Sequence, residues 1–228
     1  MARLRILAIE TATAACSAAL YIDGQIRERQ ALAPREHARL ILPMIESLLV
    51  EAGLPVGGLD AVAFGRGPGS FTGVRIAASV AQGIAFAADL PVVAVSTLAT
   101  LALGAMRETG EHRVMAALDA RMAEVYWGIY TREPDALPVL QGEECVCAPT
   151  AVSMPNDGAW IAAGSGWASY GRELGELAGG RVIRSLPDLE PRARDLARLG
   201  AEKFSQGEII RPEEAMPVYL RDTVVRED

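Results

Sequence analysis

Residues 59–75 read LDAVAFGRGPGSFTGVR, which is an apolar segment, a turn rich in glycine and proline, and the start of a helix. Such a turn takes positive φ angles or lets another segment approach closely. We predict a strand over 59–64 and a helix over 74–88, a pairing typical of α/β sheets. Because helix N-termini bind anions, the turn is either structural or a phosphate contact. The candidate residues are Gly65, Gly67, Gly69, Ser70, Thr72 and Gly73.

The segments around this turn extend the α/β pattern. Asp23-Gly24 is a hairpin signal, and Gly53 with Pro55 ends a helical stretch. The order β-β-β-α-β-α-β-α predicts a mixed sheet covered by helices. The elements expected around the turn are strands over 4–9, 16–22, 25–32 and 90–95 and helices over 36–52 and 97–107.

The second half of the chain begins like the first. Ile9-Glu10 aligns with Leu118-Asp119 at an offset of 109 residues, and Tyr21 aligns with Tyr130 at the same offset, a weak internal repeat. We therefore predict two lobes, residues 1–107 and 108–228, with a helix over 191–206 packing back on the first. The elements expected in the second half are strands over 114–118, 124–130, 137–147 and 158–166 and helices over 172–177 and 191–204.

The charged residues exclude several chemistries. The formal net charge is −7, Lys203 is the single lysine, and there are two histidines. We therefore expect no P-loop lysine, no Schiff-base lysine and no three-histidine zinc site. The acidic balance also argues against independent binding of nucleic acid, which needs a basic surface. No apolar stretch reaches the length of a membrane span, so we expect no membrane partner.

Three cysteines, Cys16, Cys145 and Cys147, do not make a disulfide framework. Reduced thiols indicate the cytoplasm. The C-x-C pair has two interpretations: half of a metal site, or alternate residues of a strand that point to one face.

Two helices carry more apolar surface than one sheet face needs. Residues 76–88 hold no charge and many small side chains, which indicates either complete burial or a partner surface. The helix over 36–52 has a broad apolar stripe, with Leu42 and Val50 outside it. A stripe of this width indicates a second buried face.

The polar candidates are few. Glu10 and Asp119 close strands at the edge of an expected cleft between the lobes, where carboxylates either hold Mg²⁺ or bond within their own loops. Gly164-Ser-Gly166 is either a ribose or base contact or a plain turn. His37 is a metal-ligand candidate by type alone, because the position four residues later is Ile41.

Four segments resemble the TsaB (YeaZ) family. They are spread over nearly the whole chain, and the second is highly specific. The segments are Ile6–Thr13 (ILAIETAT), Gly67–Arg75 (GPGSFTGVR), Asp119–Tyr126 (DARMAEVY) and Pro217–Arg221 (PVYLR).

The resemblance implies an α/β fold of two actin/Hsp70-like (ASKHA, ribonuclease H-like) mixed-sheet lobes, the second degenerate. It also implies a non-catalytic subunit of the transferase complex that forms N6-threonylcarbamoyladenosine next to the tRNA anticodon. TsaD would be the catalytic partner and TsaE a further one, with tRNA held indirectly and a homodimer formed by the chain alone. No cofactor is expected on this chain by itself, although ATP or ADP could bind in the complex.

The resemblance also assigns residues, and departures from it limit the chemistry. TsaD carries a His-x-x-x-His metal motif, in which His37 matches the first histidine and Ile41 replaces the second, so no metal or catalytic residue is expected. The nucleotide-site remnants would be Glu10, Thr11, Asp119, Gly164 and Gly166. The partner-binding residues would be His37, Leu40, Ile41, Met44, Ile45, Leu48, Arg75, Ile76, Ser79, Val80 and Gly83. The alternatives are a metallopeptidase-like (glycoprotease) enzyme and an ATP-dependent small-molecule kinase of the same superfamily.

Overall fold

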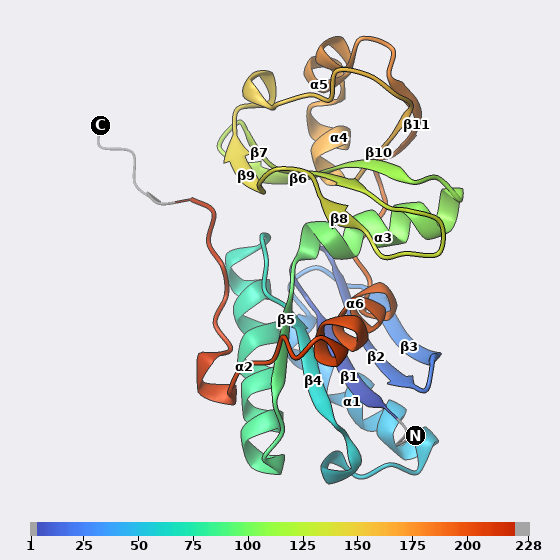
Figure 1. The fold of residues 1–228 in the computed structure, drawn as a ribbon. Helices are drawn as coiled ribbons and strands as arrows, with labels where there is room; N and C mark the ends of the chain where they lie inside the picture. Colours follow the sequence, from blue (N-terminus) through green and yellow to red (C-terminus); the bar gives the residue numbers. More distant parts are fainter. Residues whose placement is uncertain (1–3, 222–228) are drawn as a thin grey trace. The chain divides into compact units, whose positions relative to one another are not determined.

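The computed structural model describes residues 4–221, which form two compact units (Figure 1). Within this range the first unit holds residues 4–100 and 190–217, and the second holds 101–189 and 218–221. This division differs from the predicted one at residues 107 and 108. The reason is that helix α3 (Thr97–Thr109) continues across the boundary and a C-terminal segment returns to the first unit.

The sheet of the first unit has five strands in the order β3-β2-β1-β4-β5. The three N-terminal strands pair antiparallel, and β1, β4 and β5 run parallel. The β2–β3 hairpin turns at Asp23 and Gly24, which both have positive φ as the sequence predicts. The strands are β1 (Arg5–Glu10), β2 (Ala15–Ile22), β3 (Gln25–Leu32), β4 (Ala61–Gly65) and β5 (Val92–Val95).

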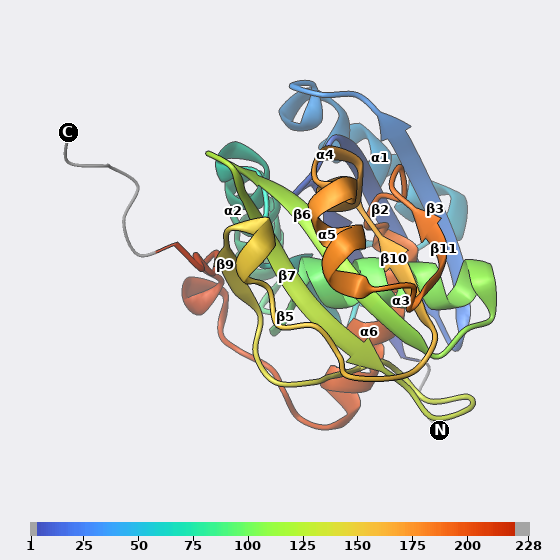
Figure 2. The same cartoon turned by 90° about the horizontal axis from the view of Figure 1, so that it is seen from above.

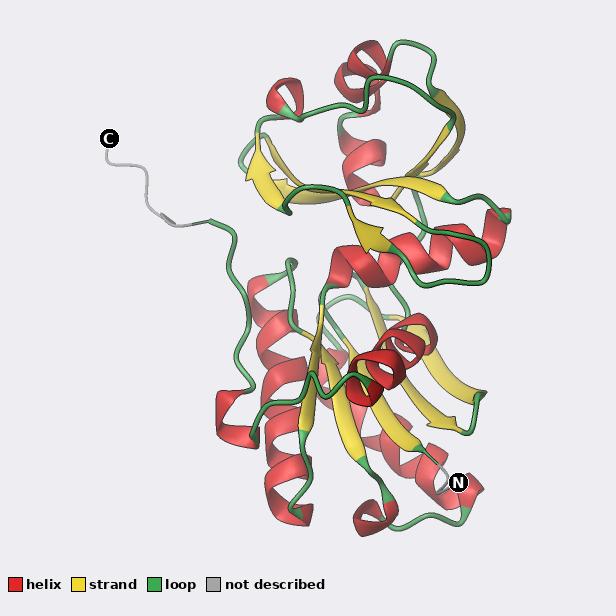
Figure 3. Ribbon diagram, viewed as in Figure 1, coloured by secondary structure: helices red, strands yellow, loops and turns green. Residues whose placement is uncertain are grey.

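Helices cover both faces of this sheet (Figure 3). Leu7 and Ile9 point into an apolar core with α1 (His37–Ala52) and α2 (Phe71–Ala88). Ile6 points to the other face, where it lies beside Gly200 of α6 (Ala193–Ser205). The 3₁₀ turns of this unit are η1 (Val56–Gly58) and η3 (Pro212–Glu214).

Helix α2 is the one helix within residues 4–221 that is long and apolar enough to cross a membrane. Helices in the cores of soluble proteins pass the same test. In this structure Ala77, Ala81 and Ala85 of α2 are buried in the core of the first unit, so its composition is explained in part by packing.

The sheet of the second unit has the order β11-β10-β6-β7-β8, with β9 also paired to β7. Helices α4 and α5 lie over one face (Figure 2) and enclose a core with Trp127, Trp160 and Trp167. A 3₁₀ turn, η2, spans Pro149–Ala151. The remaining elements are β6 (Arg113–Arg121), β7 (Glu124–Thr131), β8 (Val139–Leu140), β9 (Cys145–Cys147), β10 (Trp160–Ala163), β11 (Val182–Leu186), α4 (Ser165–Ser169) and α5 (Gly171–Ala178).

The two sheets share one topology. In each sheet an antiparallel hairpin (β1–β2 or β6–β7) is followed by two parallel strands on the other side (β4–β5 or β10–β11). Glu10 and Asp119 take equivalent places on β1 and β6, as the repeat at offset 109 predicts. The second unit has only the short α4 and α5 where the first has α1 and α2. The prediction of two mixed-sheet lobes, the second degenerate, is confirmed.

Several element predictions differ from the structure in detail. The strand over 137–147 is two short strands, because Gly142 between them has φ +81°. The strand over 158–166 ends at Ala163, and Gly164 with φ +97° precedes α4. Strand β11 was missed because its side chains are mostly exposed and lack an apolar alternation.

Candidate functional site

The glycine-rich turn between β4 and α2 packs against the segment that follows β1. A Cβ atom on Gly73 would lie 2.0 Å from the carbonyl oxygen of Thr11, and one on Gly69 would lie 2.5 Å from that of Ala12. The amide of Ser70 donates to the Ala12 carbonyl (2.7 Å), and the Thr11 hydroxyl donates to the Gly73 carbonyl (2.7 Å). These glycines are therefore required by the close approach of the chain's own backbone, which supports the structural interpretation.

The remaining turn residues belong to the start of α2. Ser70 is its N-cap and accepts from the amide of Gly73 at 3.4 Å. Thr72 is exposed in the first turn, and Gly67 has φ +100°. A phosphate contact at this turn stays a prediction.

Glu10 ends β1 as a fully buried carboxyl group. It accepts from the amide of Ala12 (2.8 Å) and from the hydroxyl of Thr97 (3.5 Å). A Cβ atom on Gly65 would lie 2.3 Å from its Oε2 atom, so a larger residue there would displace the carboxyl group. Burial, with a smaller contribution from Glu190, raises the pKa of Glu10 from 4.5 to about 7.

The second unit brings its three candidate residues together. The amide of Asp119 donates to Ser165 Oγ (3.1 Å), and its carboxylate accepts from the amide of Arg121 (2.8 Å). Cβ atoms on Gly164 and Gly166 would lie 2.5 Å and 2.7 Å from atoms of Ala117. Asp119 is thus a carboxylate bonded within its own hairpin, and the two glycines let α4 approach β6.

Part of the predicted partner-binding set is buried inside the first unit. Ile41, Ile45 and Leu48 have exposures of 0%, 4% and 0% and belong to the core that α1 shares with the sheet. The prediction that Ile41 and Leu48 face a partner is wrong, because this side of the stripe covers the chain's own strands. Ile45 is buried as well, but it also lines a hollow on the outer side of the helix. Leu40 and Met44 are half-buried beside the same core.

The opposite side of α1 and the adjoining α2 form the α1/α2 surface, which contains two hollows. Val50 and Leu42 are 75% and 54% exposed in the first hollow. The first hollow is lined by Leu42, Pro43, Ile45, Glu46, Leu49, Val50, Gly53, Leu54, Pro55, Val56 and Ile84. The second is lined by Ala38, Phe71, Thr72, Arg75, Ile76, Ser79 and Val80.

Four predicted partner-binding residues, Arg75, Ile76, Ser79 and Val80, therefore line the second hollow. Gly83 is exposed on the same helix. The site prediction omitted Leu42, Val50 and Phe71, although the place of the first two outside the buried stripe was a usable signal.

His37 begins α1 and is 8% exposed, and its Nε2 atom has no hydrogen-bond partner in the structure. The position four residues later is the buried Ile41. Among residues 4–221 no three His, Cys, Asp or Glu side chains lie together in a way that could hold a metal ion.

Comparison with known proteins identifies the family. The family model of TsaD, tRNA N6-adenosine threonylcarbamoyltransferase, matches residues 26–168. The Escherichia coli "tRNA threonylcarbamoyladenosine biosynthesis protein TsaB" is 44% identical over 224 residues, covering 97% of this chain and 96% of the relative. The chain belongs to the TsaB family. The TsaB protein of Haemophilus influenzae is 40% identical over 233 residues, covering 98% of this chain and 96% of that protein.

A solved structure, YeaZ from Pseudomonas aeruginosa, is similar with a TM-score of 0.90 and 46% identity over 95% of this chain and all of that one. The four segments that resemble the TsaB family also meet in pairs in this structure. Thr11 and Ala12 bond to the turn at Ser70 and Gly73, as described above. Arg221 forms an ion pair with Glu124 and donates to the Ala120 carbonyl (3.1 Å).

Proposed function

We propose that this chain is a non-catalytic, stabilising subunit for the formation of N6-threonylcarbamoyladenosine in tRNA. Its partners would be TsaD, which would catalyse the transfer, and TsaE, with tRNA held through the complex and any ATP or ADP bound there. The names of the relatives support a role in threonylcarbamoyladenosine biosynthesis. The match to the TsaD family model supports a fold related to that of the proposed partner. The proposal places the chain in the cytoplasm.

The observation that carries the proposal is the α1/α2 surface. Val50 and Phe71 are 75% and 57% exposed, and Phe86 of α2 is 76% exposed. Exposed apolar surface of this kind marks protein–protein contacts. Val50 lines the first hollow and Phe71 the second, so the helices of a related lobe could pack there by burying apolar area.

The carboxylates support an accessory role. Glu10 is buried and bonded to Ala12 and Thr97, and Asp119 is bonded to Arg121 in its own hairpin. Each carboxylate thus serves the local structure of its own unit.

The test is co-purification with TsaD and a tRNA modification assay with purified components. Val50→Asp places a charge in the first hollow and should abolish both co-purification and modification. Val139→Asp is the matched control, because Val139 is 60% exposed on β8 of the second unit. Unchanged association of Val50→Asp, or equal loss in both variants, would overturn the proposed docking surface. Modification by TsaD and TsaE without this chain would overturn the accessory role.

A further inference from the structure

The second unit carries two free thiols that the proposed function does not use. Cys145 and Cys147 are alternate residues of β9, so their side chains share one face of the sheet. Their Sγ atoms lie 3.9 Å apart, and both residues are partly exposed. Of the two interpretations that the C-x-C spacing allowed, alternate residues of a strand is the one that the structure shows.

The surroundings of the pair are apolar, and the strand that carries it is short. In the antiparallel register Cys145 lies opposite Trp127 and Cys147 opposite Val125, and both thiols pack against the tryptophan-rich core. Strand β9 is three residues long, and among the described residues it pairs with β7 alone.

We infer that Cys145 and Cys147 form a redox-modification site, which closes into a reversible intrachain disulfide by exchange with a low-molecular-weight disulfide. Alternate residues of a strand have Cα atoms about 6.6 Å apart, near the upper end of the ~4.4–6.8 Å that a disulfide spans. The Cβ atoms of a disulfide lie about 3.5–4.5 Å apart, which is closer than in alternate residues of a regular strand, so closing the bond needs a local distortion of β9. Such a strained bond is readily reduced, which makes it a reversible modification and not a structural crosslink.

The exchange balances with oxidised glutathione as the oxidant. Burial and the adjacent Cys145 raise the pKa of the Cys147 thiol to about 12. The Cys145 thiolate attacks one glutathione sulfur, and the other glutathione leaves as a thiolate. Cys147 then releases its proton to solvent, attacks the Cys145 sulfur and displaces the second glutathione. Two protein thiols are oxidised, and one external disulfide is reduced to two thiols.

The third cysteine is an internal control. Cys16 lies in the core of the first unit with 0% exposure, whereas Cys145 and Cys147 are partly exposed. It should stay reduced under conditions that oxidise the pair, because exchange needs access to the thiolate.

The experiment titrates the purified full chain through glutathione buffers from reducing to oxidising, with a chelator present. Remaining thiols are then alkylated, and the intact mass and the peptides are measured. We expect two of the three thiols to disappear in one step, to map to Cys145 and Cys147, and to return fully with dithiothreitol. The chain has three tryptophans, Trp127, Trp160 and Trp167, all in the adjacent core, so their emission should change over the same titration.

Two variants keep the test interpretable. Cys147→Ser should stop at a glutathione adduct on Cys145, and Cys16→Ser should still lose two thiols. Independent adducts on both cysteines, covalent dimers, or thiols that stay free until the chain is denatured would overturn the inference. In a parallel titration without the chelator, protection of the thiols that the chelator abolishes would instead indicate a bound soft metal ion and would also overturn it.

Discussion

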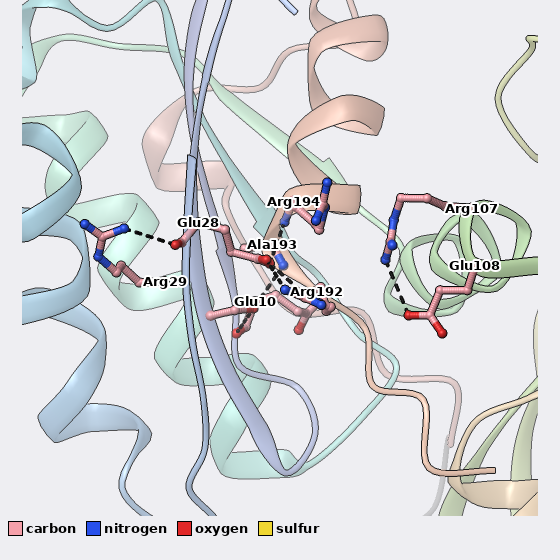
Figure 4. Close-up of polar contacts among 9 residues, drawn as sticks. Glu10, Glu28, Arg29, Arg107, Glu108, Arg192, Ala193 and Arg194 are labelled. Carbon is pink, nitrogen blue, oxygen red and sulfur yellow. Dashed lines mark hydrogen bonds and ion pairs between the residues drawn. The ribbon is translucent and has the colours of Figure 1, made fainter. Parts of the chain in front are cut away.

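The carboxylate of Glu28 accepts a hydrogen bond from the backbone amide of Arg194 at 3.1 Å, so a residue of β3 caps the N-terminus of α6 (Figure 4). Helix α6 has no side-chain cap of its own. The amide of Ala193 donates to the hydroxyl of Ser17 on β2 (2.9 Å), and Glu28 also forms an ion pair with Arg192. Two strands therefore supply the acceptors that the first turn needs.

Glu28→Ala should destabilise the chain by roughly 1–3 kcal/mol, because it removes a helix cap and half of a shielded ion pair. The Glu28 side chain is only 10% exposed in that pair. Urea unfolding followed by circular dichroism measures the change. Glu51→Ala is the control: its ion pairs with Arg27 and Arg29 are well exposed and should contribute under about 1 kcal/mol. Equal losses in the two variants would contradict the capping role.

Two glycines of α2 should respond in opposite directions to alanine. Gly73→Ala places a Cβ atom 2.0 Å from the Thr11 carbonyl oxygen, and the clash should cost more than about 2 kcal/mol. Gly83 has no atom within 4 Å of its Cβ position. Gly83→Ala should therefore stabilise the isolated chain by up to about 1 kcal/mol through helix propensity. Thermal unfolding of both variants measures these changes. An unchanged melting temperature for Gly73→Ala would show that the turn is looser than described.

Glu10 should make stability depend on pH. Its pKa of about 7 in the folded chain exceeds the ordinary 4.5, so the folded state binds the proton more tightly than the unfolded state does. Stability should therefore fall as pH rises from about 4.5 to about 7, and the loss should be complete above that range.

Glu10→Gln isolates this effect, because the amide stays neutral and still offers an acceptor to the Ala12 amide. Its free energy of unfolding should exceed that of the unmodified chain by an amount that grows with pH, to roughly 3 kcal/mol. Denaturant unfolding at several pH values measures this difference. A difference that does not vary with pH would show that the group ionises normally.

Substitutions at Ile41 and Val50 of α1 should have different effects, the first on folding and the second on docking alone. Ile41 is 0% exposed, and Ile41→Asp buries an unpaired charge, so we expect a loss of more than about 3 kcal/mol or an unfolded chain. Val50 is 75% exposed, and Val50→Asp should leave the melting temperature nearly unchanged. The thermal unfolding curves of the isolated variants give the result, and a stable Ile41→Asp would restore the partner-facing assignment of that side.

The sequence predicts most helices and strands of the first unit, because long periodic segments and strong turn signals coincide there. Helix α1 and the hairpin at Asp23 and Gly24 are examples. Periodicity identifies an apolar stripe but not which part of it meets the sheet, so it could not correct the partner-facing assignment of Ile41 that the family resemblance implied. Only tertiary packing distinguishes it from Val50.

The polar candidates show a second limit. The sequence places Glu10 at the end of β1 correctly, whereas β6 continues for two residues beyond Asp119, to Arg121. It contains no sign that Gly65 would lie against the Glu10 carboxyl group or that Ser165 would bond to the Asp119 amide. Such contacts join segments far apart in the chain, so local sequence patterns do not predict them.

Because residues 190–217 belong to the first unit, that unit cannot finish folding until the end of the chain has been synthesised. The five strands of the first sheet leave the ribosome well before α6, which covers one of their faces. Residues 101–189, the main stretch of the second unit, also leave the ribosome before α6, while the first sheet still exposes apolar strand surface. Contacts between such distant segments form late and slowly. A nascent chain halted before residue 190 should therefore bind chaperones through its N-terminal sheet.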